Sequence, residues 1–156
     1  MNRATKTGLI PRPAVRACLL RALLMAAPLV GCGSPGEAPG EVSFPPEPLT
    51  TLTTASGLWQ VAVRTFPQPP IKGLDAVQFQ ITDVNGLGVD GLTVTAVPWM
   101  AAHGHGTSAR TRVVAQGTGV YQIDNVYLYM DGRWELRSTL AASEASESVT
   151  PVFDVP

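Results

Sequence analysis

Cysteine is scarce in this chain of 156 residues, which has 2 cysteines, Cys18 and Cys32, and none after residue 32. The region beyond Cys32 therefore has neither a disulfide nor a cysteine nucleophile. Other catalytic patterns are missing too: the sequence has no Gly-x-Ser-x-Gly, no His-Glu-x-x-His and no phosphate-binding loop with a following Lys. Ser108 stands near two histidines, but no acid is placed to orient a histidine as a base. We therefore expect that the protein is not an enzyme.

Basic residues are also few after Cys32. Six of the 11 Lys and Arg follow it, as do all 12 Asp and Glu, so this part of the chain has a net charge of −6. Nucleic-acid binding depends on clustered Lys and Arg, so we expect no nucleic-acid partner. The acidic balance is compatible with a cationic ligand, although solubility explains it as well.

Aromatic residues make up 6% of the chain and charged residues 15%, whereas there are 15 Gly and 14 Pro. This composition favours many short strands and turns over helices.

The first 31 residues have the features of a signal peptide. Residues 1–21 are basic without any acid, residues 22–30 are apolar, and Leu29-Val30-Gly31-Cys32 follow. The apolar run is shorter than the about 20 residues that span a bilayer. The last four residues resemble a bacterial lipobox, which implies that residues 1–31 are removed and Cys32 is lipidated. Ordinary cleavage, which would leave Cys32 unmodified, is the alternative.

This interpretation predicts an exported protein that is lipid-anchored to the bacterial cell envelope. Gly33 rather than Asp follows Cys32, which by resemblance to sorted lipoproteins suits the inner face of the outer membrane or the cell surface. Residues 32–48 are rich in Pro, Gly and Glu and have little to bury, so they predict a flexible tether. The folded domain is expected to cover residues 49–156.

Alternating apolar and polar residues dominate this domain and predict β-strands. Hairpin signals such as Asn85-Gly86 and Asp90-Gly91 separate the strands. The predicted strands cover residues 49–54, 58–66, 76–83, 92–99, 112–116, 120–125, 134–141 and 149–155. Seven to eight short strands without a helix predict an all-β fold, an antiparallel β-sandwich, with Trp134 as a core anchor.

Two short segments hold every Met and His beyond the signal peptide. Residues 98–106 read PWMAAHGHG and contain Met100, His103 and His105, and residues 127–134 read YLYMDGRW and contain Met130. Thioether and imidazole groups suit copper. Because the loops at one end of a sandwich cluster, these four residues are a candidate copper site.

The same residues have a simpler interpretation. A Met at the end of a strand commonly packs in the core, and HGHG is also compatible with a polar turn. Two hypotheses therefore stay open. One is a metal-binding protein that captures copper or delivers it to a receiving protein. The other is a non-metal interaction module that docks to another envelope protein or to a membrane complex.

Four motifs, in order along the chain, resemble the YtkA-like domain. They are Thr82-Asp83-Val84-Asn85-Gly86, residues 100–106, Gly119-Val120-Tyr121 and residues 130–136. The resemblance covers residues 55–142. It implies an immunoglobulin-like β-sandwich of exported or membrane-attached bacterial proteins, akin to FixH-like and CopC-like domains, with a link to copper handling in parts of the family.

One departure from the family pattern concerns the candidate ligands. The family loop resembles Met-Pro-x-Met-x-His-Gly, whereas here Ala101 replaces the Pro and His103 stands at the position of the second Met. The exchange keeps a ligand but makes the set harder. Both Cu(I) and Cu(II) therefore remain candidates.

Overall fold

The computed structural model describes residues 42–156, which form ten β-strands and no helix. The predicted signal peptide, Cys32 and the first part of the predicted tether lie outside these residues. The strands are β1 (Thr50–Thr53), β2 (Gln60–Phe66), β3 (Gly73–Thr82), β4 (Thr93–Met100), β5 (His105–Gly106), β6 (Arg112–Gly117), β7 (Val120–Leu128), β8 (Gly132–Ala141), β9 (Ser146–Val149) and β10 (Val152–Val155). Within this part of the chain, no helix is long and apolar enough to cross a membrane.

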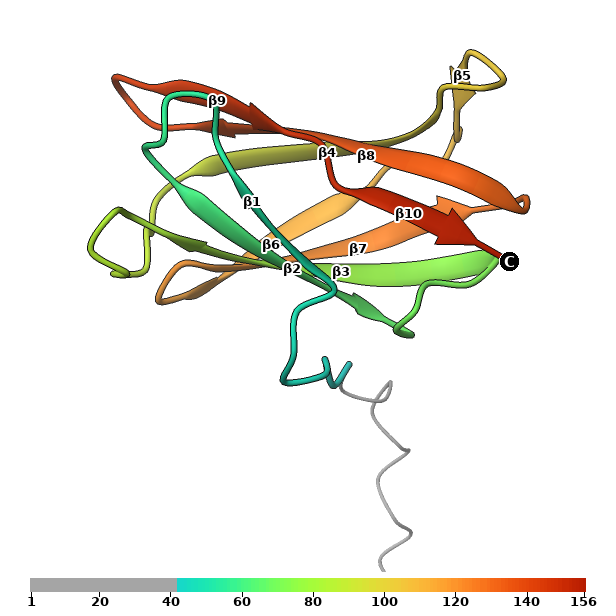
Figure 1. The fold of residues 1–156 in the computed structure, drawn as a ribbon, viewed down its shortest axis with the longest axis horizontal. Helices are drawn as coiled ribbons and strands as arrows, with labels where there is room; N and C mark the ends of the chain where they lie inside the picture. Colours follow the sequence, from blue (N-terminus) through green and yellow to red (C-terminus); the bar gives the residue numbers. More distant parts are fainter. Residues whose placement is uncertain (1–41) are drawn as a thin grey trace, which may run out of the picture. The chain divides into compact units, whose positions relative to one another are not determined.

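The strands form two packed antiparallel sheets (Figure 1). One sheet, here called sheet A, has the order β1-β2-β3-β7-β6, and the other, sheet B, has the order β10-β8-β4-β5 with β9 also paired to β8. The orders β2-β3-β7-β6 and β10-β8-β4 correspond to strands A-B-E-D and G-F-C of a constant-type immunoglobulin domain. The prediction of an immunoglobulin-like β-sandwich is thus confirmed.

The sandwich has ten strands rather than the seven to eight expected. The predicted last strand, residues 149–155, is reduced to β10, and β9 lies mostly in residues 146–148, where no strand was predicted. Pro151, which has no N–H to donate, separates the two. Both strands pair with β8, and the carbonyl of Pro151 accepts a hydrogen bond from the amide of Leu136 at 2.9 Å. The two-residue strand β5 is too short to be recognised from alternation.

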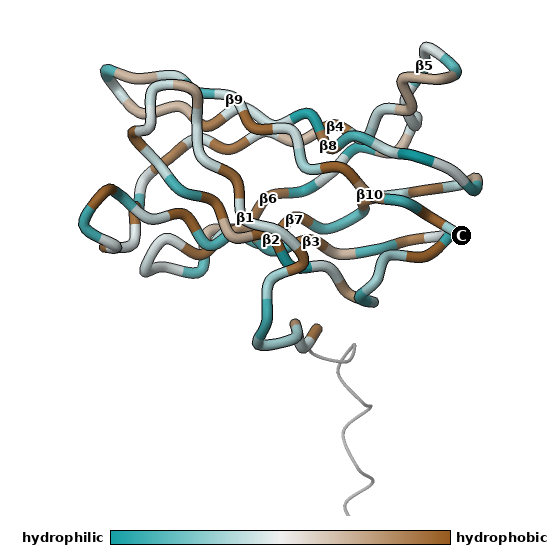
Figure 2. Tube along the Cα trace, viewed as in Figure 1, coloured by the Kyte–Doolittle hydropathy of each residue, from teal (hydrophilic) through white to brown (hydrophobic). Residues whose placement is uncertain are grey.

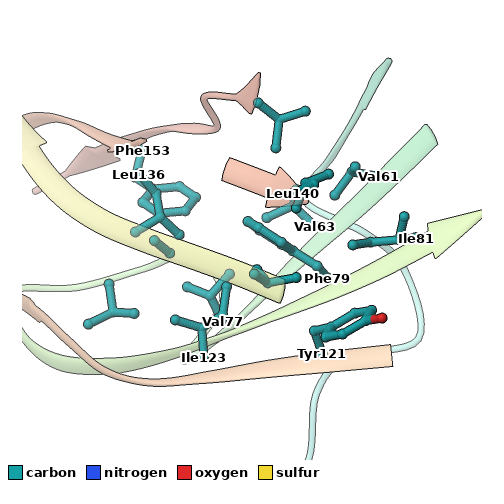
Figure 3. Close-up of a cluster of buried hydrophobic side chains, with 14 of the residues drawn as sticks. Val61, Val63, Val77, Phe79, Ile81, Tyr121, Ile123, Leu136, Leu140 and Phe153 are labelled. Carbon is teal, nitrogen blue, oxygen red and sulfur yellow. The ribbon is translucent and has the colours of Figure 1, made fainter. Parts of the chain in front are cut away.

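Apolar and polar residues alternate along the strands (Figure 2), and the apolar side chains meet between the two sheets (Figure 3). Trp134 is fully buried, as predicted, and its indole N–H donates to the carbonyl of Met130 at 2.9 Å. Phe79 of β3 and Phe153 of β10 enter the same core from opposite sheets. This core lies wholly within residues 49–156.

A β-bulge in β7 changes which of its side chains face the core. Asp75 pairs with Val126 but Val77 pairs with Ile123, so β7 has one residue more than β3 at this point. Asn125 takes up the extra residue in a left-handed conformation, with φ of 60°. As a result, odd-numbered residues of β7 face the core before the bulge and even-numbered residues face it afterwards. Tyr127 therefore points outward.

The chain joins the sandwich along β2. Arg64 donates from Nε and Nη2 to the carbonyl of Pro46 at 3.2 and 3.0 Å, and Gln68 donates to the carbonyl of Glu47 at 3.1 Å. The end of the predicted tether is thus fixed to the domain by its backbone.

Candidate functional site

The two histidines lie on the hairpin that joins β4 to β5. Met100, the last residue of β4, pairs with His105, the first residue of β5. The amides of His103 and Gly104 both donate to the carbonyl of Met100, at 3.1 and 3.0 Å. Gly104 has φ of 70°, a left-handed conformation that glycine adopts without strain. This tight turn brings the rings of His103 and His105 to a centroid distance of 5.6 Å, and both side chains are exposed.

Met100 lies beneath this hairpin and is 1% exposed. Residues directly opposed across an antiparallel pair have their Cβ atoms on the same face of the sheet, about 4.5–5.5 Å apart. The side chains of Met100 and His105 therefore leave the backbone on the same face. The methyl end of Met100 reaches the β8 strand: a Cβ added at Gly132 would lie 3.3 Å from its Cε. In this structure Met100 is part of the core.

Met130 lies on the neighbouring turn between β7 and β8. It is partly buried and packs against the core, and its carbonyl accepts the indole hydrogen bond of Trp134. The β4–β5 hairpin and the β7–β8 turn lie at the same end of the sandwich (Figure 1), as expected for the four candidate ligands. Their burial differs, however: the imidazoles are exposed, Met130 is intermediate and Met100 is enclosed.

Tyr129 connects the two loops. Its phenolic oxygen lies 2.8 Å from Nδ1 of His105, and the two rings stack at 6.0 Å with an interplanar angle of 20°. The ring of Tyr129 also meets Trp134 edge-on at 5.3 Å. An exposed imidazole is therefore tied to the buried core through two aromatic rings. Because Nδ1 is engaged, Nε2 is the nitrogen through which His105 can bind a metal.

The sequence placed Tyr129 and Trp99 beside the candidate site, where each could shield a copper ion or cap the core. In the structure Tyr129 is half-buried against the core and contacts His105, a hydrogen bond that the sequence did not reveal. A non-glycine residue with positive φ is uncommon and Asn is enriched there, so Asn125 was a signal for the bulge in β7. Trp99, which also lies next to the candidate site in the sequence, has a different position. It stands beside Met100 on the opposite face of β4, with the guanidinium of Arg137 4.6 Å from its ring centre.

A shallow hollow of about 410 Å³ adjoins the hairpin, lined by Gly106, Thr107, Ser108, Tyr127 and Tyr129. Ser108 is exposed there. Among residues 42–156, no three His, Cys, Asp or Glu side chains are grouped in a way that could hold a metal ion. A metal site here must therefore be built from the imidazoles together with sulfur or another ligand.

Comparisons with known proteins identify the family to which the domain belongs. The fold resembles a crystal structure of a DUF4426 family protein from Pseudomonas aeruginosa PAO1, with a TM-score of 0.46 and 12% identity, over 63% of this chain and 90% of that one. A comparison with curated protein sequences found no match. The family model described as YtkA-like matches residues 53–139, which is more than half of the chain. The four motifs fall in this segment, and the protein therefore belongs to the YtkA-like family.

Proposed function

We propose that this protein is a lipid-anchored envelope protein whose YtkA-like domain binds copper at the β4–β5 hairpin, for capture of the metal or for its delivery to a receiving protein. The observation that carries the proposal is the pair of exposed imidazoles of His103 and His105, 5.6 Å apart. One of them is oriented by Tyr129. Metal-binding histidines commonly have their second ring nitrogen held by such a partner.

The burial of the four candidate ligands ranks their roles. His103 and His105 need no rearrangement to meet an ion from solvent. Met130 is half-buried and requires a small one. Met100 must leave the core, at a cost of about 1.5–3 kcal/mol for the lost burial, although its three rotatable bonds make such a movement feasible. We therefore propose the imidazoles as the primary ligands, with Met130 and then Met100 joining for the softer Cu(I).

The anchoring part of the proposal is supported by the N-terminal sequence. The basic leader, the short apolar run and Leu29-Val30-Gly31-Cys32 favour export and lipidation at Cys32. A Cys32→Ser variant should accumulate as unprocessed precursor. Mass spectrometry of the mature wild-type protein tests the same point, since an N-terminus elsewhere with an unmodified Cys32 would contradict it.

A second candidate function is the interaction module without metal. The enclosed thioether of Met100 favours it, because this side chain already has a packing role. On this alternative, the hairpin and the hollow beside Tyr127 and Tyr129 would form a protein-docking surface.

Copper titration of the domain comprising residues 42–156 separates the two. The wild-type domain should bind one copper ion, with weaker binding in His103→Ala and His105→Ala and unchanged binding in Ser108→Ala, an exposed control from the adjoining hollow. Absence of binding tighter than about micromolar, roughly −8 kcal/mol, for both Cu(I) and Cu(II) would reject the metal hypothesis.

A further inference from the structure

The outer face of sheet A is divided into an apolar and a polar half. At the end where β3 begins, Leu74 and Tyr127 are direct cross-strand partners that are 65% and 41% exposed. Phe66 is 46% exposed and pairs with Ala76, which places it diagonally from Leu74, within reach of contact. Ile71, in the loop that leads into β3, is 49% exposed. These four residues, Phe66, Ile71, Leu74 and Tyr127, are called the apolar patch below.

The other half of this face carries glutamines. Gln78 and Gln80 follow on the outward side of β3. Gln78 pairs with Gln122 of β7. The glutamines of sheet A are Gln60, Gln78, Gln80, Gln116 and Gln122. Contiguous exposed apolar side chains are unusual on a monomeric domain and indicate a contact surface. Because glutamines cover the other half of sheet A, the exposed apolar side chains are confined to one end of its outer face.

Charges next to the apolar patch are paired. Lys72 lies 3.4 Å from Asp131, and Arg112 lies 3.5 Å from Asp124. These two ion pairs balance charge beside the patch, and the further acid Asp75 lines the same hollow as Leu74 but is buried.

The chain enters the domain at the apolar patch. Val42, the first described residue, lines a hollow of about 470 Å³ together with Leu74, Ala76 and Asn125. Cys32 lies ten residues before Val42 in the sequence. Ten residues span at most about 35 Å when fully extended and about 17 Å on average when flexible. A lipid attached at Cys32 would hold the point where the chain enters the domain within that distance of the bilayer.

We propose that the apolar patch rests on the lipid surface in which Cys32 is anchored. The inference rests on the lipid-anchor part of the proposed function. A short tether raises the local concentration of the patch at the bilayer, so a contact too weak to bind a free domain is sufficient. The β4–β5 hairpin belongs to sheet B, which lies on the other side of the sandwich (Figure 1). Tyr127 also lines the hollow beside this hairpin, and its ring lies 6.0 Å from that of Tyr129, so the histidines lie next to the docked face.

Site-specific fluorescence on the full-length lipidated protein tests this orientation. The chain beyond Cys32 has no cysteine, so Leu74→Cys or Leu87→Cys supplies a single reactive thiol for an environment-sensitive dye. Leu87 is a matched control because it is 66% exposed, against 65% for Leu74, and lies in the β3–β4 loop at the opposite end of the sandwich. The proteins are reconstituted in vesicles of phosphatidylethanolamine and phosphatidylglycerol that contain a nitroxide-labelled lipid.

The expected result is quenching by the nitroxide lipid that is several-fold stronger at position 74 than at position 87. A second variant, Leu74→Asp, read with the dye at Ile71→Cys, should abolish quenching at position 71, whereas Leu87→Asp should leave it unchanged. Equal, weak quenching at positions 74 and 87 in protein that floats with the vesicles would overturn the docking alone.

Two other outcomes would also overturn the inference. Protein that does not float with the vesicles and has an unmodified Cys32 would remove the anchor itself, and with it the proposed localisation. A dye at position 74 that is shielded from water but not quenched, with energy transfer between differently labelled molecules, would show that a second copy of the chain covers the patch.

Discussion

The phenolic oxygen of Tyr129 and Nδ1 of His105 lie 2.8 Å apart, so the β7–β8 turn is hydrogen bonded to the histidine hairpin. If Nδ1 carries the proton, it donates to the phenol and Nε2 has a free lone pair for a metal. The stacking of the two rings and the edge contact with Trp134 restrict the orientation further. Tyr129 is thus suited to position His105 before an ion arrives.

We predict that Tyr129→Phe weakens copper binding by about 10-fold or more, in the range found when the partner of a metal-binding histidine is removed. The ring and its packing on Trp134 are retained, so the free energy of unfolding should fall by less than about 1.5 kcal/mol. Copper titration and chemical denaturation measure the two effects. Nitrogen NMR of the metal-free protein should also show a changed tautomer balance for His105, and an unchanged balance would contradict the positioning role.

We predict that Met130→Leu lowers affinity for Cu(I) and leaves affinity for Cu(II) nearly unchanged, because it removes the soft sulfur and keeps a similar apolar volume. Competition with a Cu(I) chelator measures the change. Met100→Leu serves as the comparison, since a volume-conserving exchange in the core costs less than about 1.5 kcal/mol. Equal Cu(I) affinity in wild type and in both variants would assign the methionines to packing.

Asp75 predicts an unusual pH dependence of stability. It is 3% exposed and pairs with Val126 on the core-facing side, and neither carboxylate oxygen has a hydrogen-bond partner within residues 42–156. Burial raises its pKa from 3.8 to about 6, and the nearby amide of Ile71, which does not form a regular hydrogen bond, opposes this only partly. The folded state therefore holds this proton more tightly than the unfolded state.

The stability contributed by this proton is complete below pH 3.8 and is lost as the pH rises towards 6. A rise of the pKa of Asp75 from 3.8 to about 6 corresponds to about 3 kcal/mol at most. Asp75→Asn should abolish this loss and be more stable than wild type at pH 7, by up to that amount. Urea denaturation at pH 4.5 and pH 7 measures it, with the exposed Asp154→Asn as control. A decline in Asp75→Asn as steep as in wild type would exclude Asp75 as the cause.

Trp134→Ala should lower the free energy of unfolding by about 3–5 kcal/mol, the cost of a large cavity in the core. Trp134→Phe should lower it by less, because the smaller ring still fills part of the space while the carbonyl of Met130 loses its indole donor. Thermal and denaturant unfolding measure both. A Trp134→Ala domain as stable as wild type would be incompatible with the burial of this ring.

The strands and the core could be predicted where the alternation is regular. Val77, Phe79 and Ile81 of β3 were expected on one face, and all three are fully buried. The two candidate loops were expected at one end of the sandwich because β4 ends there and β8 begins there. Both predictions were possible because apolar and polar residues alternate in these strands without a local irregularity.

Other features depend on geometry that alternation does not encode. The burial of Met100 follows from the register of β4 against β5 and from the space beside Gly132. The anchoring of Pro46 and Glu47 uses backbone carbonyls, which every residue possesses. The hydrogen bond between Tyr129 and His105 depends on the course of the turn after β7, which alternation does not encode.

The left-handed conformation of Asn125 affects the orientation of residues beyond the bulge itself. If Asn125 instead adopted a regular extended conformation, β7 would alternate strictly and would turn inside out from that point to its end. Val126 and Leu128 would move to the surface, and Tyr127 would be directed into the interior. The outward face of sheet A would lose the exposed ring of Tyr127 at the same time. A single backbone irregularity thus determines which residues of β7 build the core and which form the surface.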